Sequence, residues 1–166
     1  MLLGRAVAII TGETSRIYPP QVRWVEIQHQ QTHERYQIPV GPDDHLFGLA
    51  VPPGDYVLIR VQISEGPFLS LADLSMDFSV RSDGVTFAGT WRFGVDSPRY
   101  GRMVLVSLVQ DHDDQTRAEE WLHRRFPERQ AAVLTATLPD PTEAEFRLYE
   151  VMPYPRYQKY FRRHLW

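Results

Sequence analysis

Short runs of apolar and β-branched residues, separated by turn residues, recur along the whole chain, and this pattern is typical of β-strands. The clearest run covers residues 56–63 and follows a turn at Pro53 and Gly54. Its period of two predicts a wholly aliphatic face, formed by Val57, Ile59, Val61 and Ile63. Further runs predict strands at residues 4–11, 22–29, 36–38, 46–50, 76–80, 85–93, 102–110, 131–138 and 145–151.

The turn residues between these runs predict two β-hairpins. Residues 41–44 and residues 82–84 each have a turn composition, and each lies between two strand-like runs. Alternation also assigns faces within the runs. Val22 and Trp24 are expected on one side of their strand, with Val25 and Ile27 on the other. One common face is expected for Val85, Phe87, Gly89, Trp91 and Phe93.

One run has the periodicity of a helix. Thr116 and Glu119 fit a capping box, and Pro127 would stop the helix. Between them, one helical face carries Ala118, Trp121, Leu122, Arg125 and Phe126. This pattern predicts a helix at residues 116–126 that packs onto the strands as a lid.

Many short strands with a single late helix predict an all-β fold, specifically an antiparallel β-sandwich. Antiparallel pairing is expected because the connections between runs are too short for parallel crossovers. A chain of 166 residues is the size of one globular domain. Residues 1–151 are therefore expected to form the sandwich with its inserted helix, and residues 152–166 a separate C-terminal segment.

The composition is that of a folded protein without cysteine chemistry. Hydrophobic residues make up 43% of the chain and charged residues 23%, which excludes a disordered chain. The net charge of −3 is not the broad positive charge of most nucleic-acid-binding proteins. With no cysteine there is no disulfide, zinc–thiolate site, iron–sulfur cluster or cysteine nucleophile. A soluble chain is expected, because no apolar run reaches the roughly 20 residues of a membrane span and no signal peptide is recognisable at Met1.

The C-terminal segment, residues 152–166, has the most unusual composition. It carries four of the 18 basic residues and no acidic residue, so its charge is +4, whereas residues 1–151 have 14 basic and 21 acidic residues, or −7. Apolar residues recur at helical spacing, which predicts an amphipathic segment. The candidate binding residues are Tyr154, Arg156, Tyr157, Lys159, Tyr160, Phe161, Arg162, Arg163 and Trp166.

Three interpretations of what this C-terminal segment contacts remain open. It could dock on the protein's own acidic surface and close a sheet edge. It could instead contact a partner protein or an anionic membrane surface, since aromatic and arginine side chains suit both. Single-stranded nucleic acid is disfavoured, because a charge of +4 on an acidic body is small for that role.

Candidate catalytic and metal-binding residues are few. His29 and His33 stand four residues apart, and Asp111, His112, Asp113 and Asp114 form a dense acidic run. Both groups lack a convergent third ligand or the spacing of a calcium loop, and acidic residues are common at helix N-termini. Asp73 and Asp77 are a possible acid pair, and no serine lies in a Gly-x-Ser-x-Gly elbow. No metal or other cofactor is expected.

Three ordered motifs carry a resemblance to a known family. They are Pro53-Gly54-Asp55-Tyr56 before a long strand, Gly89-Thr90-Trp91-Arg92-Phe93 at the end of a later strand, and an acidic stretch leading to a helix that ends at Phe126-Pro127. Together they resemble bacterial envelope proteins, many of them lipoproteins, with a transthyretin-like (prealbumin-like) sandwich. The resemblance implies a binding or structural module without catalytic residues, in the cell envelope or periplasm. The chain lacks that family's lipid-anchored cysteine, and a true start at Met1 would make it cytoplasmic.

These observations predict a non-enzymatic binding or assembly module of the bacterial cell envelope, which contacts a protein partner or an anionic surface through its C-terminal segment. The alternative is a small metal-assisted enzyme that acts near residues 111–114 or near His29 and His33.

Overall fold

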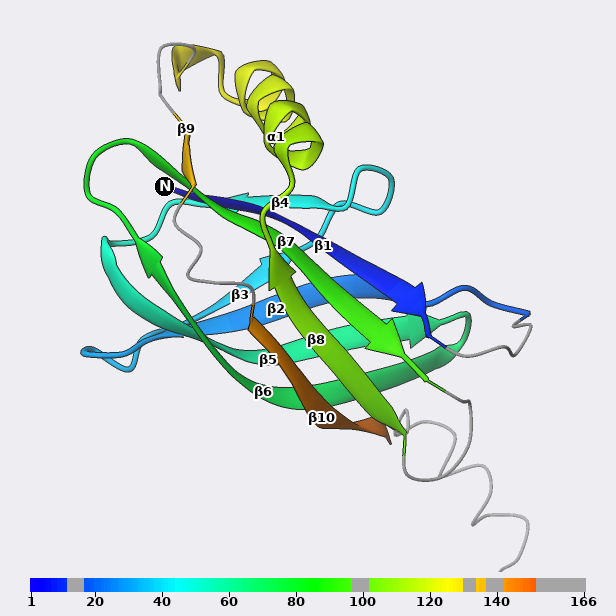
Figure 1. Ribbon diagram of the computed structural model, residues 1–166. Coiled ribbons are helices and arrows are strands. Elements are labelled where there is room, and N and C mark those ends of the chain that lie inside the picture. Colours follow the sequence, from blue (N-terminus) through cyan, green and yellow to red (C-terminus); the bar gives the residue numbers. More distant parts are fainter. Residues whose placement is uncertain (12–16, 97–101, 130–133, 137–141, 152–166) are drawn as a thin grey trace, which may run out of the picture.

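The computed structural model describes residues 1–11, 17–96, 102–129, 134–136 and 142–151 (Figure 1). These residues form ten strands, one α-helix and one short 3-10 helix. In chain order the elements are β1 (Leu2–Ile10), β2 (Gln21–His29), β3 (Arg35–Pro39), β4 (Leu46–Leu49), β5 (Gly54–Glu65), β6 (Phe68–Val80), β7 (Val85–Val95), β8 (Met103–Val109), α1 (His112–Arg125), η1 (Pro127–Arg129), β9 (Leu134–Ala136) and β10 (Thr142–Val151). The expectation of an all-β fold with one helix is confirmed for this part of the chain.

The strands form one sheet that is nearly closed into a barrel. Nine of them are hydrogen-bonded in the order β3-β2-β5-β6-β10-β8-β7-β1-β4, and β9 pairs beside this path with β7. Strand β10 makes the sheet continuous, because residues 142–147 pair with β8 and residues 148–151 pair with β6. The described strands thus form a single sheet that bends at β10 (Figure 1), and the expected sandwich is not confirmed.

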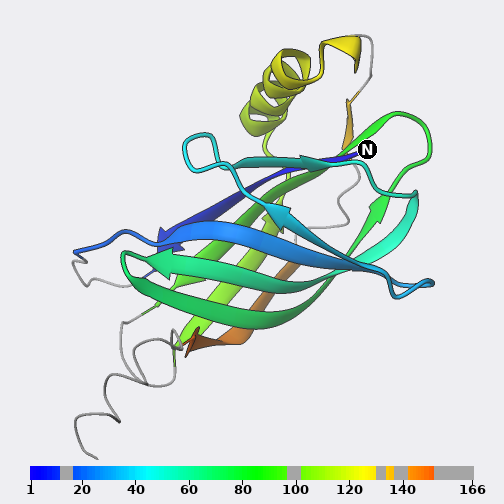
Figure 2. The same cartoon turned by 180° about the vertical axis from the view of Figure 1, so that it is seen from behind.

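Strands β3 and β4 are the two end strands of the sheet, and the segment that contains them lies on the side of the barrel opposite β10 (Figure 2). Strand β3 pairs with β2, and β4 pairs with β1. The turn between them continues both ladders, because the Val40 amide donates to the Arg23 carbonyl and the Ala6 amide donates to the His45 carbonyl. The expected hairpin across residues 41–44 is therefore wrong. The two short strands each satisfy the edge of a longer strand instead of pairing with each other.

The expected hairpin across residues 82–84 is also wrong. Strand β6 pairs with β5 and β10, whereas β7 pairs with β1, β8 and β9. The pairing of β7 with β1 and with β9 is parallel, which corrects the expectation of antiparallel pairing throughout. Short connections limit only strands that follow one another along the chain. Strands β1 and β7 are distant in sequence, so that limit does not apply to them.

Bulges overturn the predicted faces of β5 and β2. In β5 the register shifts between Leu58 and Arg60, so that Leu58 and Val61 both point into the barrel and the aliphatic face expected at residues 57–63 is broken. In β2 the register shifts between Val22 and Trp24, which leaves Val22 buried and Trp24 half-buried on the outer face. A bulge adds one residue to one strand, so the alternation of faces reverses there.

Strand β7 is buried on both faces, with a switch at Gly89. Trp91 and Phe93 belong to the main core inside the barrel, whereas Val85 and Phe87 belong to a second core on the outer face. The register with β1 shifts at this point, and Gly89 has a φ of 75°. Glycine adopts this left-handed conformation without steric cost, so it permits the reversal. The common face predicted for residues 85–93 is therefore wrong.

Aromatic side chains run across the interior of the barrel. Trp91 is 0% exposed, and its ring centroid lies 4.8 Å from that of Phe47 and 5.3 Å from that of Phe78. The Trp91 Nε1–H donates to the Ala88 carbonyl at 2.8 Å, so its one polar group is satisfied. The Phe78 ring in turn stacks on Tyr56 at 5.7 Å.

Helix α1 begins four residues before the predicted start at Thr116. Asp111 is the N-cap, and its carboxylate accepts from the Asp113 amide at 3.0 Å. Thr116 instead lies inside the helix, where its hydroxyl donates to the His112 carbonyl. The predicted capping box is wrong, but the predicted lid is confirmed. The helix packs on the outer face of the sheet through a second core of Leu3, Leu46, Val85, Phe87, Ala118 and Leu122.

Candidate functional site

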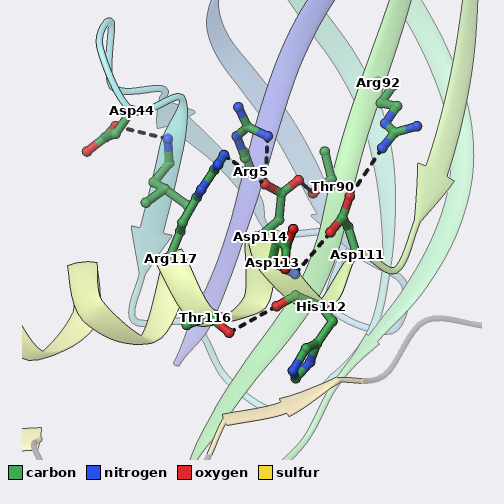
Figure 3. Close-up of polar contacts among 11 residues, drawn as sticks. Arg5, Asp44, Thr90, Arg92, Asp111, His112, Asp113, Asp114, Thr116 and Arg117 are labelled. Carbon is green, nitrogen blue, oxygen red and sulfur yellow. Dashed lines mark hydrogen bonds and ion pairs between the residues drawn. The ribbon is translucent and has the colours of Figure 1, made fainter.

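The acidic run at the start of α1 docks the helix on the sheet (Figure 3). Asp114 is 3% exposed. Its Oδ1 lies 2.7 Å from Arg5 Nη1 on β1, and its Oδ2 accepts from the Thr90 hydroxyl on β7 at 2.7 Å. Arg117 Nη1, one helical turn further along, lies 3.5 Å from Oδ1. Asp114 thus binds β1, β7 and α1 together.

The charge of Asp114 is held by these partners. Burial raises the pKa of its carboxyl, but the hydrogen bonds from Thr90 and Arg5 and the positive charges of Arg5 and Arg117 outweigh burial. The net result is a pKa below the ordinary value of an aspartate. Asp114 is therefore a carboxylate that stabilises the folded chain, not a proton donor at neutral pH.

The rest of the acidic run does not converge with Asp114 on an ion. Asp111 caps the helix and lies 3.6 Å from Arg92, while His112 and Asp113 are exposed. Among the described residues no group of three or more histidine, aspartate or glutamate side chains is arranged to hold a metal. The geometry gives residues 111–114 a structural role at the helix N-terminus.

His29 ends β2 and His33 lies in the turn between β2 and β3, and the two side chains do not converge. His29 is buried, and its Nδ1 accepts from the backbone amides of Gln31 and Thr32. These two donors require an unprotonated Nδ1, so the ring holds its proton on Nε2. His33 has a φ of 58° and is exposed, and its Nδ1 lies 3.3 Å from the Gln28 side-chain amide. His29 caps the turn and leaves no nitrogen pair for a metal.

Asp73 and Asp77 both lie on the outer face of β6, where each has a different partner. Asp73 accepts from Arg60 at 2.7 Å and from the Tyr149 hydroxyl at 3.1 Å, whereas Asp77 accepts from Gln30. The hydrogen bond to Asp73 raises the pKa of Arg60 above its already high value. Each carboxylate therefore lies on the surface with its own hydrogen-bond partner, and the two do not form an acid pair that shares a proton.

The exposed large hydrophobic side chains of the described residues gather at one end of the barrel. Strand directions place the last residues of β1, β7 and β10 at the same end as the β5–β6 hairpin and the starts of β2 and β8 (Figure 1, right). Every such side chain lies within four residues of one of these strand ends. We call this set the apolar end: Ile9, Ile10, Ile17, Tyr18, Phe68, Leu105 and Tyr149.

The opposite end is polar. Its turns are residues 30–34, 50–53 and 81–84, which are rich in glutamine, threonine, proline, arginine, serine and aspartate. None of the large hydrophobic side chains described there is exposed. Local sequence patterns did not indicate the apolar end, because its residues come from five separate segments and only the strand topology brings them together. An exposed Phe68 directly after the Gly66-Pro67 turn was the one local signal.

A nearly buried ion pair lies at the apolar end. The Arg102 guanidinium donates to the Glu65 carboxylate, and the two side chains are 15% and 11% exposed. Arg102 Nε is buried and has no hydrogen-bond partner among the described residues. Beside this pair the Tyr18 ring covers Gly66, which has a φ of 59°. A Cβ at residue 66 would lie 2.6 Å from the Tyr18 ring, so glycine is required for both reasons.

The candidate binding residues of the C-terminal segment, from Tyr154 to Trp166, lie outside the described residues. The last described residue is Val151, which pairs with Leu69 at the start of β6 and so lies at the apolar end. The chain therefore enters the C-terminal segment from this end.

Comparison of the chain with protein-family models, with curated proteins and with solved structures finds no match. The described residues include no helix that is long and apolar enough to cross a bilayer.

Proposed function

We propose that the chain is a non-enzymatic binding or assembly module, whose contact surface is the apolar end together with the C-terminal segment. The observation that carries this proposal is the gathering of all the exposed large hydrophobic side chains described at the end where residue 152 begins. Apolar side chains concentrated on one part of a surface mark an interaction site. The C-terminal segment that follows Val151 contains aromatic and basic residues from Tyr154 to Trp166, which are side chains that favour interfaces.

The distribution of charge supports the same surface. The segment carries +4, and the preceding 151 residues carry −7, from 14 basic and 21 acidic residues. Glu65 at the apolar end is paired with Arg102 and Asp83 at the polar end is paired with Arg81, so the contrast in charge comes from the C-terminal segment. A partner with negative charge would therefore be oriented toward one end of the molecule.

We further propose that the module works in the bacterial cell envelope as a member of the transthyretin-like family. The support is the ordered set of motifs around Pro53, Trp91 and Phe126, together with an all-β fold. The genomic DNA upstream of the Met1 codon tests the location. An in-frame apolar segment followed by a cysteine supports an envelope protein, and a ribosome-binding site directly before Met1 contradicts it.

Site-specific photo-crosslinking tests the contact surface in the cells that make the protein. A photoreactive phenylalanine analogue replaces Phe68 at the apolar end of one variant and Tyr157 in the C-terminal segment of another. A matched control places the same analogue at Gln31, which is exposed in a turn of the polar end. We expect discrete adducts, whether with protein or lipid, from positions 68 and 157 and none from position 31.

The control at position 31 distinguishes specific contacts from random collisions. Equal adducts from all three positions would indicate random collisions and would contradict the proposed surface. The absence of adducts from positions 68 and 157 under irradiation would contradict it as well. Thermal unfolding of each variant, compared with the unmodified chain, verifies that the analogue leaves the fold intact.

A further inference from the structure

The geometry points to an anionic lipid bilayer as the surface that the apolar end contacts, an inference that rests on the proposed function. In this arrangement the apolar end enters the headgroup region of the bilayer, and the basic residues of the C-terminal segment contact anionic headgroups. The polar end and α1 then face away from the lipid.

The spacing of the side chains in the apolar end favours a bilayer over a protein partner. Its seven side chains come from four strand ends and one loop, with exposed fractions from 38% for Leu105 and Tyr149 to 89% for Ile17. Ile9 and Leu105 flank Gly94 in one cross-strand row, and Phe68 projects from the β5–β6 hairpin. A protein partner would need a pocket matched to each of these side chains. A bilayer accepts apolar side chains at any spacing, because its acyl region is fluid.

The types of side chain present also suit a membrane interface. The apolar end combines aliphatic side chains with Tyr18 and Tyr149, and the C-terminal segment adds Tyr154, Tyr157 and Trp166. Tyrosine and tryptophan place an apolar ring in lipid and a polar group in water, so they concentrate at membrane interfaces. Basic residues beside such an anchor strengthen its binding to anionic lipids.

The charge of the C-terminal segment favours an anionic bilayer over a neutral one. The C-terminal segment, at +4, begins at the apolar end, whereas the rest of the chain is at −7. An anionic surface would attract the segment. The same surface would repel acidic groups of the rest of the chain, but salt screens this repulsion for groups more than a Debye length of about 10 Å away. Asp96 and Glu150 are also exposed at the apolar end, so the orientation on the bilayer depends on the charge of the C-terminal segment. A neutral bilayer would lack this electrostatic attraction.

Vesicle co-sedimentation with the full chain tests the inference. The probes are vesicles of phosphatidylcholine alone and vesicles in which a third of the lipid is phosphatidylglycerol. We expect binding to the anionic vesicles to be at least about tenfold tighter, because the C-terminal segment carries four basic residues. High salt should remove most of this difference.

A matched pair of variants locates the contact. The double variant Ile17→Ser with Phe68→Ser removes two exposed side chains of the apolar end. We expect it to bind anionic vesicles about tenfold more weakly or worse, because these two side chains no longer contribute their free energy of transfer into lipid. The control variant Gln31→Ser with Thr32→Ser alters two exposed residues of the polar end and should bind like the unmodified chain. All four positions are exposed, so both variants should retain the unmodified melting temperature.

The outcomes separate this inference from the proposed function. No binding to either vesicle, equal binding to both, or equal loss in the two variants would overturn the bilayer as the partner. Photo-crosslinking of a protein at position 68 together with no vesicle binding would overturn the bilayer and keep the proposed contact surface. Tighter anionic binding that is lost only in the apolar-end variant supports the inference.

Discussion

Replacement of Asp114 by alanine tests how the helix is held on the barrel. The Asp114 carboxylate accepts from the Thr90 hydroxyl and pairs with Arg5, each at 2.7 Å. Alanine removes both contacts at once and leaves the two partners in place. Because Ala118 and Leu122 pack against Leu3 and Phe87 in the second core, loss of this anchor weakens a cooperative unit.

The expected loss can be worked out from the exposure of the two partners. Thr90 is 0% exposed, and a buried hydroxyl without a partner costs about 1–3 kcal/mol. The Arg5 side chain is 22% exposed and would regain some water, so the 3–5 kcal/mol for breaking a wholly buried pair is an upper limit. We expect Asp114→Ala to lower the free energy of unfolding by about 3 kcal/mol.

The pH dependence gives the experiment a second readout. The pKa of Asp114 is lowered in the folded chain, so its stabilisation is complete above the unfolded pKa of about 3.9 and is lost as the pH falls through the folded pKa. Asp114→Asn keeps the shape but not this titration. The difference in stability between the unmodified chain and Asp114→Asn should therefore shrink as the pH falls below about 4.

Urea unfolding followed by far-ultraviolet circular dichroism measures both effects. The matched control is Asp113→Ala, since Asp113 is exposed in the same helical turn and should cost only about 0.5 kcal/mol through the helix dipole. If Asp114→Ala and Asp113→Ala agree within about 0.5 kcal/mol at neutral pH, Asp114 is not the anchor described.

Three further predictions concern the core, the apolar end and the C-terminal segment. Trp91→Ala should destabilise the chain by about 3–5 kcal/mol, because Trp91 is 0% exposed; an unchanged melting curve would mean that this core is assigned wrongly. Glu65→Ala should cost about 3 kcal/mol by leaving Arg102 without its partner, and adding Arg102→Leu should restore part of the loss in urea unfolding. Deletion of residues 153–166 should leave the melting temperature almost unchanged and remove the preference for anionic vesicles; loss of folding would make the segment structural.

The sequence predicted which segments are strands better than it predicted their faces. The runs at residues 22–29, 56–63 and 102–110 correspond to β2, β5 and β8. Period-two alternation then failed wherever a strand contains a bulge, as in β5 after Leu58. A bulge is stabilised by pairing with a distant strand, so local alternation does not reveal it.

Local sequence patterns predicted strand pairing and the candidate site even less well than they predicted the strand faces. Turn residues at 41–44 indicated a reversal of the chain correctly but did not indicate which strands β3 and β4 would pair with. The role of the acidic run at the helix N-terminus was expected from the dipole, yet its partners Arg5 and Thr90 lie far away in sequence. The apolar end arises from topology alone, and the binding role of the C-terminal segment stays a prediction.

Spin labels placed at the two ends of the barrel test the central claim most directly. The chain has no cysteine, so Ile17→Cys and Gln31→Cys each provide a single attachment site, and both native residues are exposed. Collision with lipid-soluble oxygen and with a water-soluble nickel complex reports the depth of each label on anionic vesicles. We predict that the label at position 17 lies in the headgroup region and that the label at position 31 stays in water. Two labels in water, or two at the same depth, would contradict the bilayer as the surface that the apolar end contacts.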